Sequence, residues 1–566
     1  MSQTIQARVS GKILQKADRL FNNSLSQVFV ELLQNARRAG ASLVTVTTTV
    51  IAPAITGITF TDNGSGIADF QQLLSLGDSG WEKEVEEHED PAGMGLFCLV
   101  HTGVTILSRG KEVTISPAAF LGKEAVEVVD QKAASAEVGT TLIFTRSANV
   151  TEIAHTLGRV VKFGPTAVIL NGNEIAREDF LADAAEITEF EGVRIGVFAK
   201  HSGNSSNDNV NFHGMVIRGP WEASLGAVLL DGSGNPLDVY ARVDVVSTSG
   251  LHLKLPDRVS VVQDEACKRV SEAIERAMYR YVASRGRHIA SFDQYTRAKG
   301  LGVDIGEALP YLGQWYARAR DSDRSEPFED DREQIQRTVV EASKVVFVDE
   351  IGDTSLPESF AFQNALKTHE LPLGLIPVNR NEQLKGYSWY AAIPVITDFK
   401  LIVDGKPAED AYPQCLAIVK EIGLSFSFIN NSGSKAIEWN DLLVAVWGTE
   451  NWDDDFTILI AETSPWATTR SLDEPFSLVS TATYVGFSYN DSGEGDSYDT
   501  QEEYFRNQAE LSMTEILGGA LQAAERSILG ALDWNVRQAL DKANLVEIRL
   551  IRDEKGSWRT DIPVSA

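Results

Sequence analysis

A carboxylate and an amide lie four residues apart near the beginning of the chain, at Glu31 and Asn35. On a helix this spacing places both side chains on the same polar face. An amide oxygen can ligate Mg²⁺, and a carboxylate beside it can take a proton from water. The same two residues are also typical of a solvated helix face, so the pair gains meaning only from what lies near it.

Asp62 opens a second motif, DNGSGI, which follows the apolar segment ITF. A carboxylate at the end of a strand can accept a hydrogen bond from an exocyclic amine such as that of adenine. Gly64 and Gly66 carry no Cβ, so the backbone can approach a flat base or a ribose closely. The alternative is an ordinary turn, because DNG is common turn chemistry.

A third motif, Gly93-Met94-Gly95-Leu96, precedes an apolar helix-like run (FCLVHTGV). Glycines before a helix N-terminus leave backbone N–H groups aimed at an anion such as phosphate. The preceding segment Leu76–Asp90 is polar, charged and glycine-bearing, which suits a loop that closes over a ligand. A helix cap and a surface loop are the alternative.

The fourth motif is Gly139-Thr140-Thr141, at the start of the strand-like segment TTLIFT. The Thr140 hydroxyl can bond to Asp62 or to a water that bridges the two. An ordinary strand start is the alternative when this motif is taken alone.

The spacing of apolar residues predicts the helices and strands that position these motifs. Leu25–Ala39 has apolar residues at three- and four-residue steps, which predicts an amphipathic helix with Ser24 as N-cap and Gly40 just beyond its end. The pattern predicts strands at Leu43–Val50, Gly57–Thr61, Val104–Ser108, Glu112–Ser116, Ala125–Val129 and Thr140–Thr145. This mixed order predicts an α+β fold, with helices on one face of a mixed sheet.

A second region continues the α/β pattern. It has predicted strands at Arg194–Ala199, Asn211–Ile217 and Val239–Val245. A helix is predicted at Asp264–Val282, with a buried stripe formed by Ala266, Val270, Ala273, Ile274, Ala277 and Met278. The expected domains are 1–185, 186–290, a helical and acidic linker region 291–335, and a C-terminal α/β region 336–566.

The C-terminal region offers no motif of this kind. Its elements are expected at Thr338–Ile351, Trp389–Val403, Leu442–Ala461, Glu502–Lys542 (helical) and Leu545–Ile551. The acidic segments Asp321–Asp331 and Asn490–Glu503 are expected to be a linker and a loop. A core is expected to take up its aromatic residues, Trp389, Tyr390, Trp439, Trp447 and Trp452.

Composition narrows the function classes. The chain has 566 residues and a formal charge of −29, so its surface repels phosphate backbones and a nucleic-acid-coating role is disfavoured. Its three cysteines have no CxxC spacing, which disfavours zinc and disulfides and favours a reducing compartment. No apolar run reaches the roughly 18 residues of a membrane helix, and the N-terminus lacks the apolar core of a signal peptide. We expect a cytoplasmic protein with no membrane partner.

Together the four motifs, in this order and spacing, resemble the GHKL (Bergerat-fold) ATPase superfamily, most clearly from Lys12 to Phe144. That group includes gyrase-B-type topoisomerases, the ninety-kilodalton heat-shock chaperone, histidine kinases and MutL. The resemblance implies a site for ATP and Mg²⁺. It makes Glu31 the general base, Asn35 the Mg²⁺ ligand and Asp62 the adenine anchor. Gly64, Gly66 and Ile67 would form the base pocket, Gly93, Met94, Gly95 and Leu96 would lie at the phosphates, Leu76–Asp90 would be the lid, and Thr140 would stand beside Asp62.

One position departs from the family pattern. The first motif often carries an aspartate three residues after the asparagine, where this chain has Arg38. Arg38 either contacts phosphate or a lid carboxylate, or is a surface residue. Several members place a basic residue from the next, transducer-like domain at the γ-phosphate, and Lys254 and Arg258 are the candidates here, with surface residues as the alternative.

The resemblance implies a Mg-dependent ATPase of the heat-shock-chaperone-like type, in which ATP drives a conformational or dimerisation switch. The expected partners are ATP, a protein partner or client and, as one arrangement, a second copy of the chain. The alternative is a nucleotide-gated interaction module with little or no hydrolysis. A histidine kinase is disfavoured because no phospho-acceptor helix pair precedes the domain, and charge disfavours mismatch repair or a topoisomerase.

Overall fold

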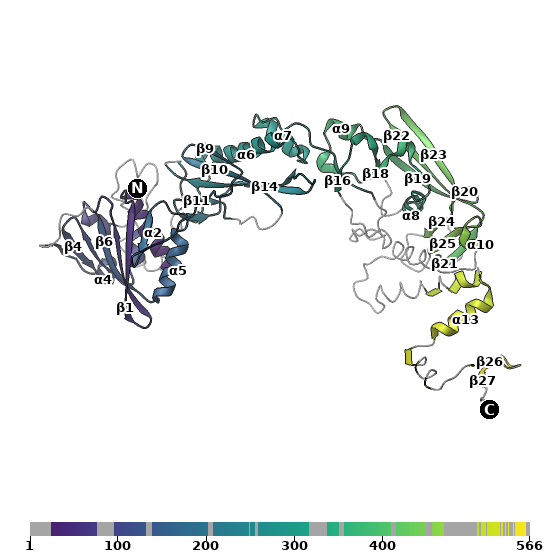
Figure 1. Ribbon diagram of the computed structural model, residues 1–566, viewed down its shortest axis with the longest axis horizontal. Coiled ribbons are helices and arrows are strands. Elements are labelled where there is room, and N and C mark those ends of the chain that lie inside the picture. The colour runs from purple at the N-terminus through teal and green to yellow at the C-terminus, as the bar shows by residue number, and fades with distance from the viewer. Residues whose placement is uncertain are drawn as a thin grey trace, which may run out of the picture. The chain divides into compact units, whose positions relative to one another are not determined.

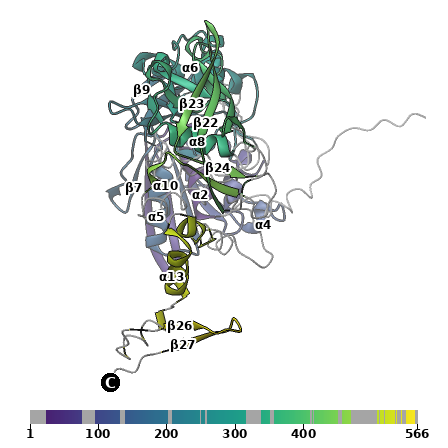
Figure 2. The same ribbon diagram turned by 90° about the vertical axis from the view of Figure 1, so that its right-hand side faces the viewer.

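The computed structural model describes residues 24–75, 95–131, 139–201, 208–247, 250–254, 259–315, 337–349, 356–408, 412, 415–448, 456–468 and 549–561, with short stretches between 507 and 547. The chain forms two compact units, Met1–Leu309 and Pro310–Ala566 (Figures 1 and 2). Each unit contains both helices and mixed sheets, so the α+β class predicted from the sequence is confirmed.

The first sheet of the N-terminal unit has eight strands in the order β5-β4-β3-β6-β2-β1-β7-β8. Neighbouring strands are antiparallel except β1 and β7, which run parallel, so the sheet is mixed as expected. The strands are β1 Leu43–Ala52, β2 Ile55–Asp62, β3 Val104–Ser108, β4 Lys111–Ile115, β5 Val128–Asp130, β6 Thr140–Arg146, β7 Ala167–Leu170 and β8 Asn173–Glu174.

Helices cover one face of this sheet. Strand β2 alternates in burial, and its Ile58 and Phe60 share a core with Phe29 and Leu32 of α2. The other face is rich in threonine, and Thr61 and Thr141 pair there through hydroxyls 3.1 Å apart. The helical elements are α2 Leu25–Arg38, η2 Phe70–Leu74, η3 Gly95–Leu99, α4 Pro117–Phe120 and α5 Val150–Val161, with α2 and α5 on one side of the strands in Figure 1.

Both predicted ends of α2 are confirmed. The Ser24 hydroxyl accepts a hydrogen bond from the backbone N–H of Gln27, as an N-cap does. Gly40 has φ +73° and donates its N–H to the carbonyl of Arg37, while Ala41 donates to that of Ala36. These two bonds form a Schellman motif, which needs a left-handed residue at the position of Gly40. The local sequence therefore fixes where the helix stops and the chain turns back to β1.

The second sheet has the order β12-β11-β14-β10-β9, with β13 also paired to β14. The predicted strand Asn211–Ile217 is wrong as one element, because His213 and Gly214 have positive φ and turn the chain into a hairpin. The strands are β9 Glu186–Phe190, β10 Val193–Lys200, β11 Val210–Phe212, β12 Met215–Ile217, β13 Ser224–Leu230 and β14 Pro236–Val245.

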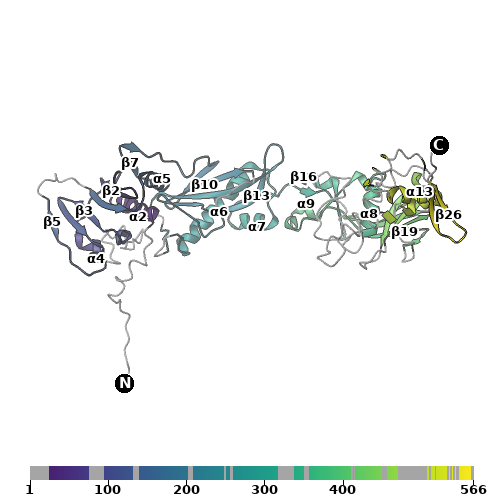
Figure 3. The same ribbon diagram turned by 90° about the horizontal axis from the view of Figure 1, so that it is seen from below.

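Helix α6 (Glu265–Arg285) packs beside this sheet, and α7 (Phe292–Gly300) follows it (Figure 3). The Asp264 side chain accepts from the backbone N–H of Cys267 and caps α6. The predicted buried stripe is correct except at Ala266, which is only half-buried, whereas Cys267 is buried.

The C-terminal unit contains a sheet in the order β18-β17-β19-β22-β23, with β20 on β19, and a sheet β21-β25-β24. Helix α8 (Leu356–Ala365) packs on both, and its Phe362 stacks against Trp439 of β23. The strands are β17 Val345–Val348, β18 Ile376–Val378, β19 Val395–Val403, β20 Lys406–Pro407, β21 Cys415–Val419, β22 Ile422–Asn430, β23 Gly433–Leu442, β24 Val444–Gly448 and β25 Phe456–Ala461.

The predicted aromatic core is found in the described residues. Tyr390 and Trp439 are buried, Trp447 packs against the core, and Trp389 is half-buried, while Trp452 lies outside the described residues. The remaining elements are β15 Tyr311–Gly313, β16 Arg337–Val339, η5 Ala342–Lys344, η6 Pro372–Gly374, η7 Glu382–Leu384, α9 Ser388–Ala391, α10 Pro465–Thr468, α13 Ala520–Ala531, β26 Arg549–Arg552 and β27 Trp558–Asp561.

Asp321–Asp331 and Asn490–Glu503 lie outside the described residues, and the four-domain division stays a prediction. Among the described helices, none is long and apolar enough to cross a membrane.

Candidate functional site

Three adjacent strands of the first sheet end in polar side chains at one level. Asp62 on β2 pairs with Thr140 on β6, which in turn pairs with Ser108 on β3. All three are buried, with exposed fractions of 7%, 8% and 5% in that order. The structure therefore brings together the predicted residues Asp62 and Thr140. It adds Ser108, which the sequence analysis did not identify.

Asp62 is a buried hydrogen-bond acceptor. Its Oδ1 accepts the N–H of Gly64 at 2.8 Å. Burial raises the pKa of Asp62 above its ordinary value of 3.8, and hydrogen bonds from the backbones of Gly64 and Thr140 partly offset this. A carboxylate held in this way has further lone pairs that can accept a hydrogen bond from a ligand.

The glycines of the DNGSGI motif have packing reasons to be glycine. A Cβ at Gly64 would lie 2.7 Å from the Cβ of Ala39, and Ser65 donates its N–H to the carbonyl of Ala39 at 2.8 Å. Gly66 has φ +74°, and a Cβ there would lie 2.9 Å from the hydroxyl of Ser108. The turn therefore packs against the C-terminal end of α2 on one side and against β3 on the other.

Glu31 and Asn35 lie on one face of α2, as predicted, and the start of η3 lies against them. A Cβ at Gly95 would be 2.8 Å from Oε2 of Glu31 and 3.3 Å from Nδ2 of Asn35. Arg38 is on the same face, and its Nη1 donates to Oδ1 of Asn35 at 3.5 Å. Gln27 donates to Oε1 of Glu31 at 3.4 Å. Only a glycine leaves this room beside the carboxylate and the amide.

A buried arginine supports η3 from the sheet side. Arg146, at the end of β6, donates from Nη2 to the carbonyl of Cys98 at 3.0 Å. Burial lowers the pKa of Arg146, while burial and the charge of Glu31 raise the pKa of the Cys98 thiol. The inner side of η3 is therefore anchored to the sheet. No sequence pattern pointed to Arg146, because its alternation places it in an apolar row.

The remaining predicted site residues differ in where they lie. The side chains of Ile67 and Leu96 pack against the apolar core of the first sheet, while the backbone N–H of Ile67 donates to the Ser108 hydroxyl at 2.9 Å. Lys254 is exposed, its backbone N–H bonds to the carbonyl of Ser260, and within the described ranges no contact joins its side chain to Asp62 or Asn35. Arg258, Gly93, Met94 and the predicted lid Leu76–Asp90 lie outside the described residues.

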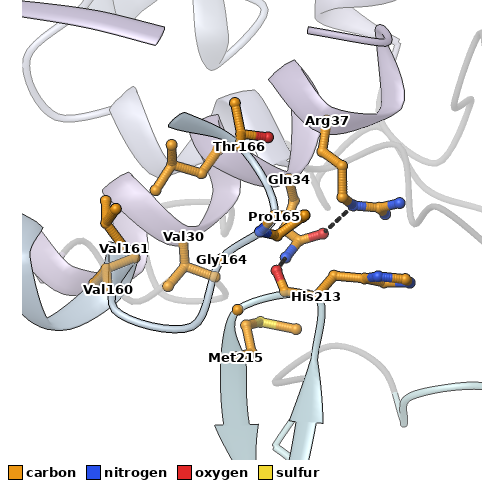
Figure 4. A pocket seen from close by; sticks show the side chains of 12 residues that line it. Val30, Gln34, Arg37, Val160, Val161, Gly164, Pro165, Thr166, His213 and Met215 are labelled. Atoms are coloured by element: carbon orange, nitrogen blue, oxygen red, sulfur yellow. Dashed lines mark hydrogen bonds between the residues drawn. The ribbon is translucent and has the colours of Figure 1, made fainter. Parts of the chain in front are cut away.

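Another face of α2 contacts the second sheet. Gln34 is 5% exposed, and its Nε2 donates to the carbonyl of His213 in the β11–β12 hairpin at 2.8 Å. Arg37 donates from Nε to Oε1 of Gln34 at 3.1 Å (Figure 4). A small pocket lies here, lined by Val30, Leu33, Gln34, Arg37, Val160, Val161, Gly164, Pro165, Thr166, His213, Gly214 and Met215.

No protein-family model and no curated protein matches the chain. Among solved structures, it is similar to the 43K ATPase domain of Thermus thermophilus gyrase B in complex with an aminocoumarin, at 16% identity and TM-score 0.28, covering 51% of this chain and 99% of that one. It is also similar to the ATP-binding domain of Francisella tularensis topoisomerase IV in complex with a small-molecule inhibitor, at 9% identity and TM-score 0.32, covering 51% and 93%.

The ATPase domain of Aquifex aeolicus MutL complexed with ADP matches at 16% identity and TM-score 0.22, covering 40% of this chain and 93% of that one. At these identities and scores, the function of this chain has to be argued from its own residues.

Proposed function

We propose that the N-terminal unit binds Mg-ATP along α2 and hydrolyses it, and that the nucleotide acts as a conformational switch. The carrying observation is that two polar groups lie at the two ends of the same helical stretch. The turn that follows Asp62 bonds to the end of α2 through the Ser65 N–H and the Ala39 carbonyl, and Gly95 lies against Glu31. Eight residues of helix separate Glu31 from Ala39, about 12 Å at 1.5 Å per residue, which is comparable to the length of a nucleoside triphosphate.

At the base end, Asp62 and Thr140 would hold adenine. The buried Asp62 carboxylate accepts a hydrogen bond from the exocyclic amine, and the glycines at 64 and 66 keep the turn close to α2 and β3. This interaction is strong because the carboxylate is shielded from water.

At the phosphate end, Asn35 and Glu31 suit a magnesium-phosphate site. Mg²⁺ takes one or two protein oxygens and fills its shell with water and substrate phosphates, so the Asn35 amide is a fitting ligand. Bound Mg²⁺ would neutralise phosphate charge. Glu31 would accept a proton from the attacking water, and Arg38, which donates to Asn35, would contact a phosphate oxygen. Gly95 and Leu96, at the start of η3, would present backbone N–H groups to the phosphates, and Gly93 and Met94 are proposed for the same role.

The switch part of the proposal concerns what α2 touches. The bond from Gln34 to the carbonyl of His213 links the helix that would hold the nucleotide to the second sheet. A ligand that shifts or stiffens α2 therefore biases the β11–β12 hairpin. Lys254 and Arg258 are proposed as basic residues that reach the γ-phosphate once the lid closes. A chaperone-like action on a protein client and ATP-driven homodimerisation are the further parts of this proposal.

The test combines phosphate release with size measurement under saturating Mg-ATP, on wild type, Asp62→Asn and Glu31→Ala. We expect wild type to release phosphate and change its size distribution with ATP, and Asp62→Asn to do neither. Glu31→Ala should keep the ATP-dependent size change and lose about 10²–10⁴-fold in turnover, the usual contribution of a general base. If wild type binds ATP but releases no measurable phosphate, the proposed ATPase activity is contradicted. The protein would then be a nucleotide-gated interaction module.

A further inference from the structure

Ser108 lies at the end of β3, beside the start of β6 and the turn that follows β2, which form the base end of the site. Its hydroxyl lies 2.7 Å from the carbonyl of Gly139, 2.9 Å from the backbone N of Ile67 and 3.4 Å from the hydroxyl of Thr140. The side chain is 5% exposed, so these protein groups take the place of water. One buried hydroxyl on β3 thus contacts two other segments, the start of β6 and the turn after β2.

The proton on Ser108 can be assigned from its partners. A serine hydroxyl has one proton and two lone pairs. The Gly139 carbonyl only accepts, so it takes the Ser108 proton, and the Ile67 N–H only donates, so it uses one lone pair. The remaining lone pair faces the Thr140 hydroxyl, which must therefore be the donor in that weak, 3.4 Å contact.

The backbone around this cluster leaves no room for a Cβ at Gly139 or Gly66. Gly139 has φ +136°, and a Cβ there would lie 2.3 Å from the carbonyl oxygen of Asp62. A Cβ at Gly66 would lie 2.9 Å from the Ser108 hydroxyl and 3.1 Å from the Gly139 carbonyl. The two glycines let the turn and β6 close tightly around the serine.

We infer that Ser108 is the positioning residue that makes the site select a base with an amino group over one with an oxo group at the same position. Ser108 accepts the hydrogen bond from the Thr140 hydroxyl. The Thr140 oxygen can then act only as an acceptor toward the ligand, beside the acceptor Asp62. Two acceptors match the exocyclic amine of adenine and repel the carbonyl of hypoxanthine. This inference rests on the proposed ATP-binding function.

The test is a calorimetric titration of the full chain with ATP and with inosine triphosphate, for wild type, Ser108→Ala, Ser108→Thr and Thr105→Val. Without Ser108, Thr140 can rotate and donate to an oxo group. We expect Ser108→Ala to bind ATP about three- to tenfold more weakly, the usual effect of one hydrogen bond, with no loss for inosine triphosphate. Ser108→Thr keeps the hydroxyl and should restore the ratio of the two affinities.

Thr105→Val is the matched control, because Thr105 also lies on β3 and pairs with the Thr114 hydroxyl on the exposed face. Its affinity ratio should equal that of wild type. If Ser108→Ala weakens both nucleotides equally, or neither, the serine does not set selectivity and the inference fails while ATP binding stands. If wild type binds no ATP, the proposed function fails and this inference with it.

Discussion

Two faces of α2 differ in how firmly the protein holds their polar side chains. On the first, Glu31 and Asn35 receive hydrogen bonds of 3.4 and 3.5 Å from neighbours on their own helix. On the second, Gln34 makes a 2.8 Å bond to His213, 179 residues away, and is supported by Arg37. Hydrogen bonds of 3.4 and 3.5 Å are long and cost little to exchange for a ligand, whereas the 2.8 Å bond of Gln34 joins two distant segments of the fold.

The comparison explains how one helix can serve both as a ligand site and as a link to the second sheet. A change on the first face should alter chemistry and leave stability nearly unchanged. A change on the second should alter stability and transmission and leave nucleotide affinity nearly unchanged.

The largest effect is expected from Gly95→Ala on the first face. The new Cβ lies 2.8 Å from Oε2 of Glu31, a flexible side chain that can move aside, so the fold survives and the general base is displaced. We expect turnover to fall by about 100-fold or more. The free energy of unfolding should change by less than about 1 kcal/mol. Phosphate release and chemical denaturation measure the two quantities.

Gly158→Ala is the control for this substitution. Gly158 lies in α5 with nothing within 4 Å of its added Cβ. Turnover should stay at the wild-type level, and the helix should gain about 0.5–1 kcal/mol. Equal turnover in the two variants would contradict the placement of Gly95 at the reacting end.

The next effect concerns the charge of Asp62. Burial raises the pKa of Asp62. The carboxylate that accepts the amine is therefore protonated as pH falls through that raised pKa. ATP affinity should begin to weaken at a higher pH than it would if this carboxyl were exposed. We expect about tenfold weaker binding for each pH unit below this pKa. Titrations of ATP across mildly acidic pH measure it.

The same shift has the opposite sign for stability. A folded-state pKa above the unfolded one favours the protonated form, so stability falls as pH rises through the folded pKa. Asp62→Asn removes that cost and should be at least as stable as wild type at neutral pH, although it loses ATP. A clear loss of stability in this variant would show that the carboxylate serves the fold.

The substitution Gln34→Ala addresses the second face. It leaves the buried His213 carbonyl without its 2.8 Å donor, and we expect a loss of about 1–3 kcal/mol in unfolding free energy. ATP affinity should stay within about twofold of wild type. Hydrogen exchange should show that ATP no longer protects residues 210–217. Retained protection would mean that the link runs elsewhere.

The smallest effect is expected from His213→Ala. Gln34 contacts the backbone carbonyl of His213, which the substitution keeps. We expect a stability change below about 1 kcal/mol and wild-type protection of the hairpin by ATP in the exchange experiment. A loss as large as that of Gln34→Ala would assign the link to the imidazole.

What the sequence could predict was local. The ends of α2 follow from Ser24 and Gly40, and the motif glycines follow from turns and close approaches within a few residues. The reason for Gly64 differs in part from the predicted one. The sequence suggested that this glycine makes room for a base, whereas in the structure the space beside it is taken by Ala39.

What it could not predict depends on contacts between distant segments. Ser108 becomes a site residue only through the β3–β6 register, and Gln34 meets His213 only after the second sheet folds. The β11–β12 hairpin was missed because its apolar pattern runs on through the turn, and only Gly214 marks the break. The burial of Cys267 instead of Ala266 reflects how α6 lies on its sheet.

The most direct test of the central claim is a calorimetric titration of the full chain with Mg-ATP, run beside Asp62→Asn. We expect saturable binding by wild type at a single site, and at least about tenfold weaker binding by the variant, since a buried charged acceptor is lost. No binding by wild type, or equal binding by both proteins, would contradict it.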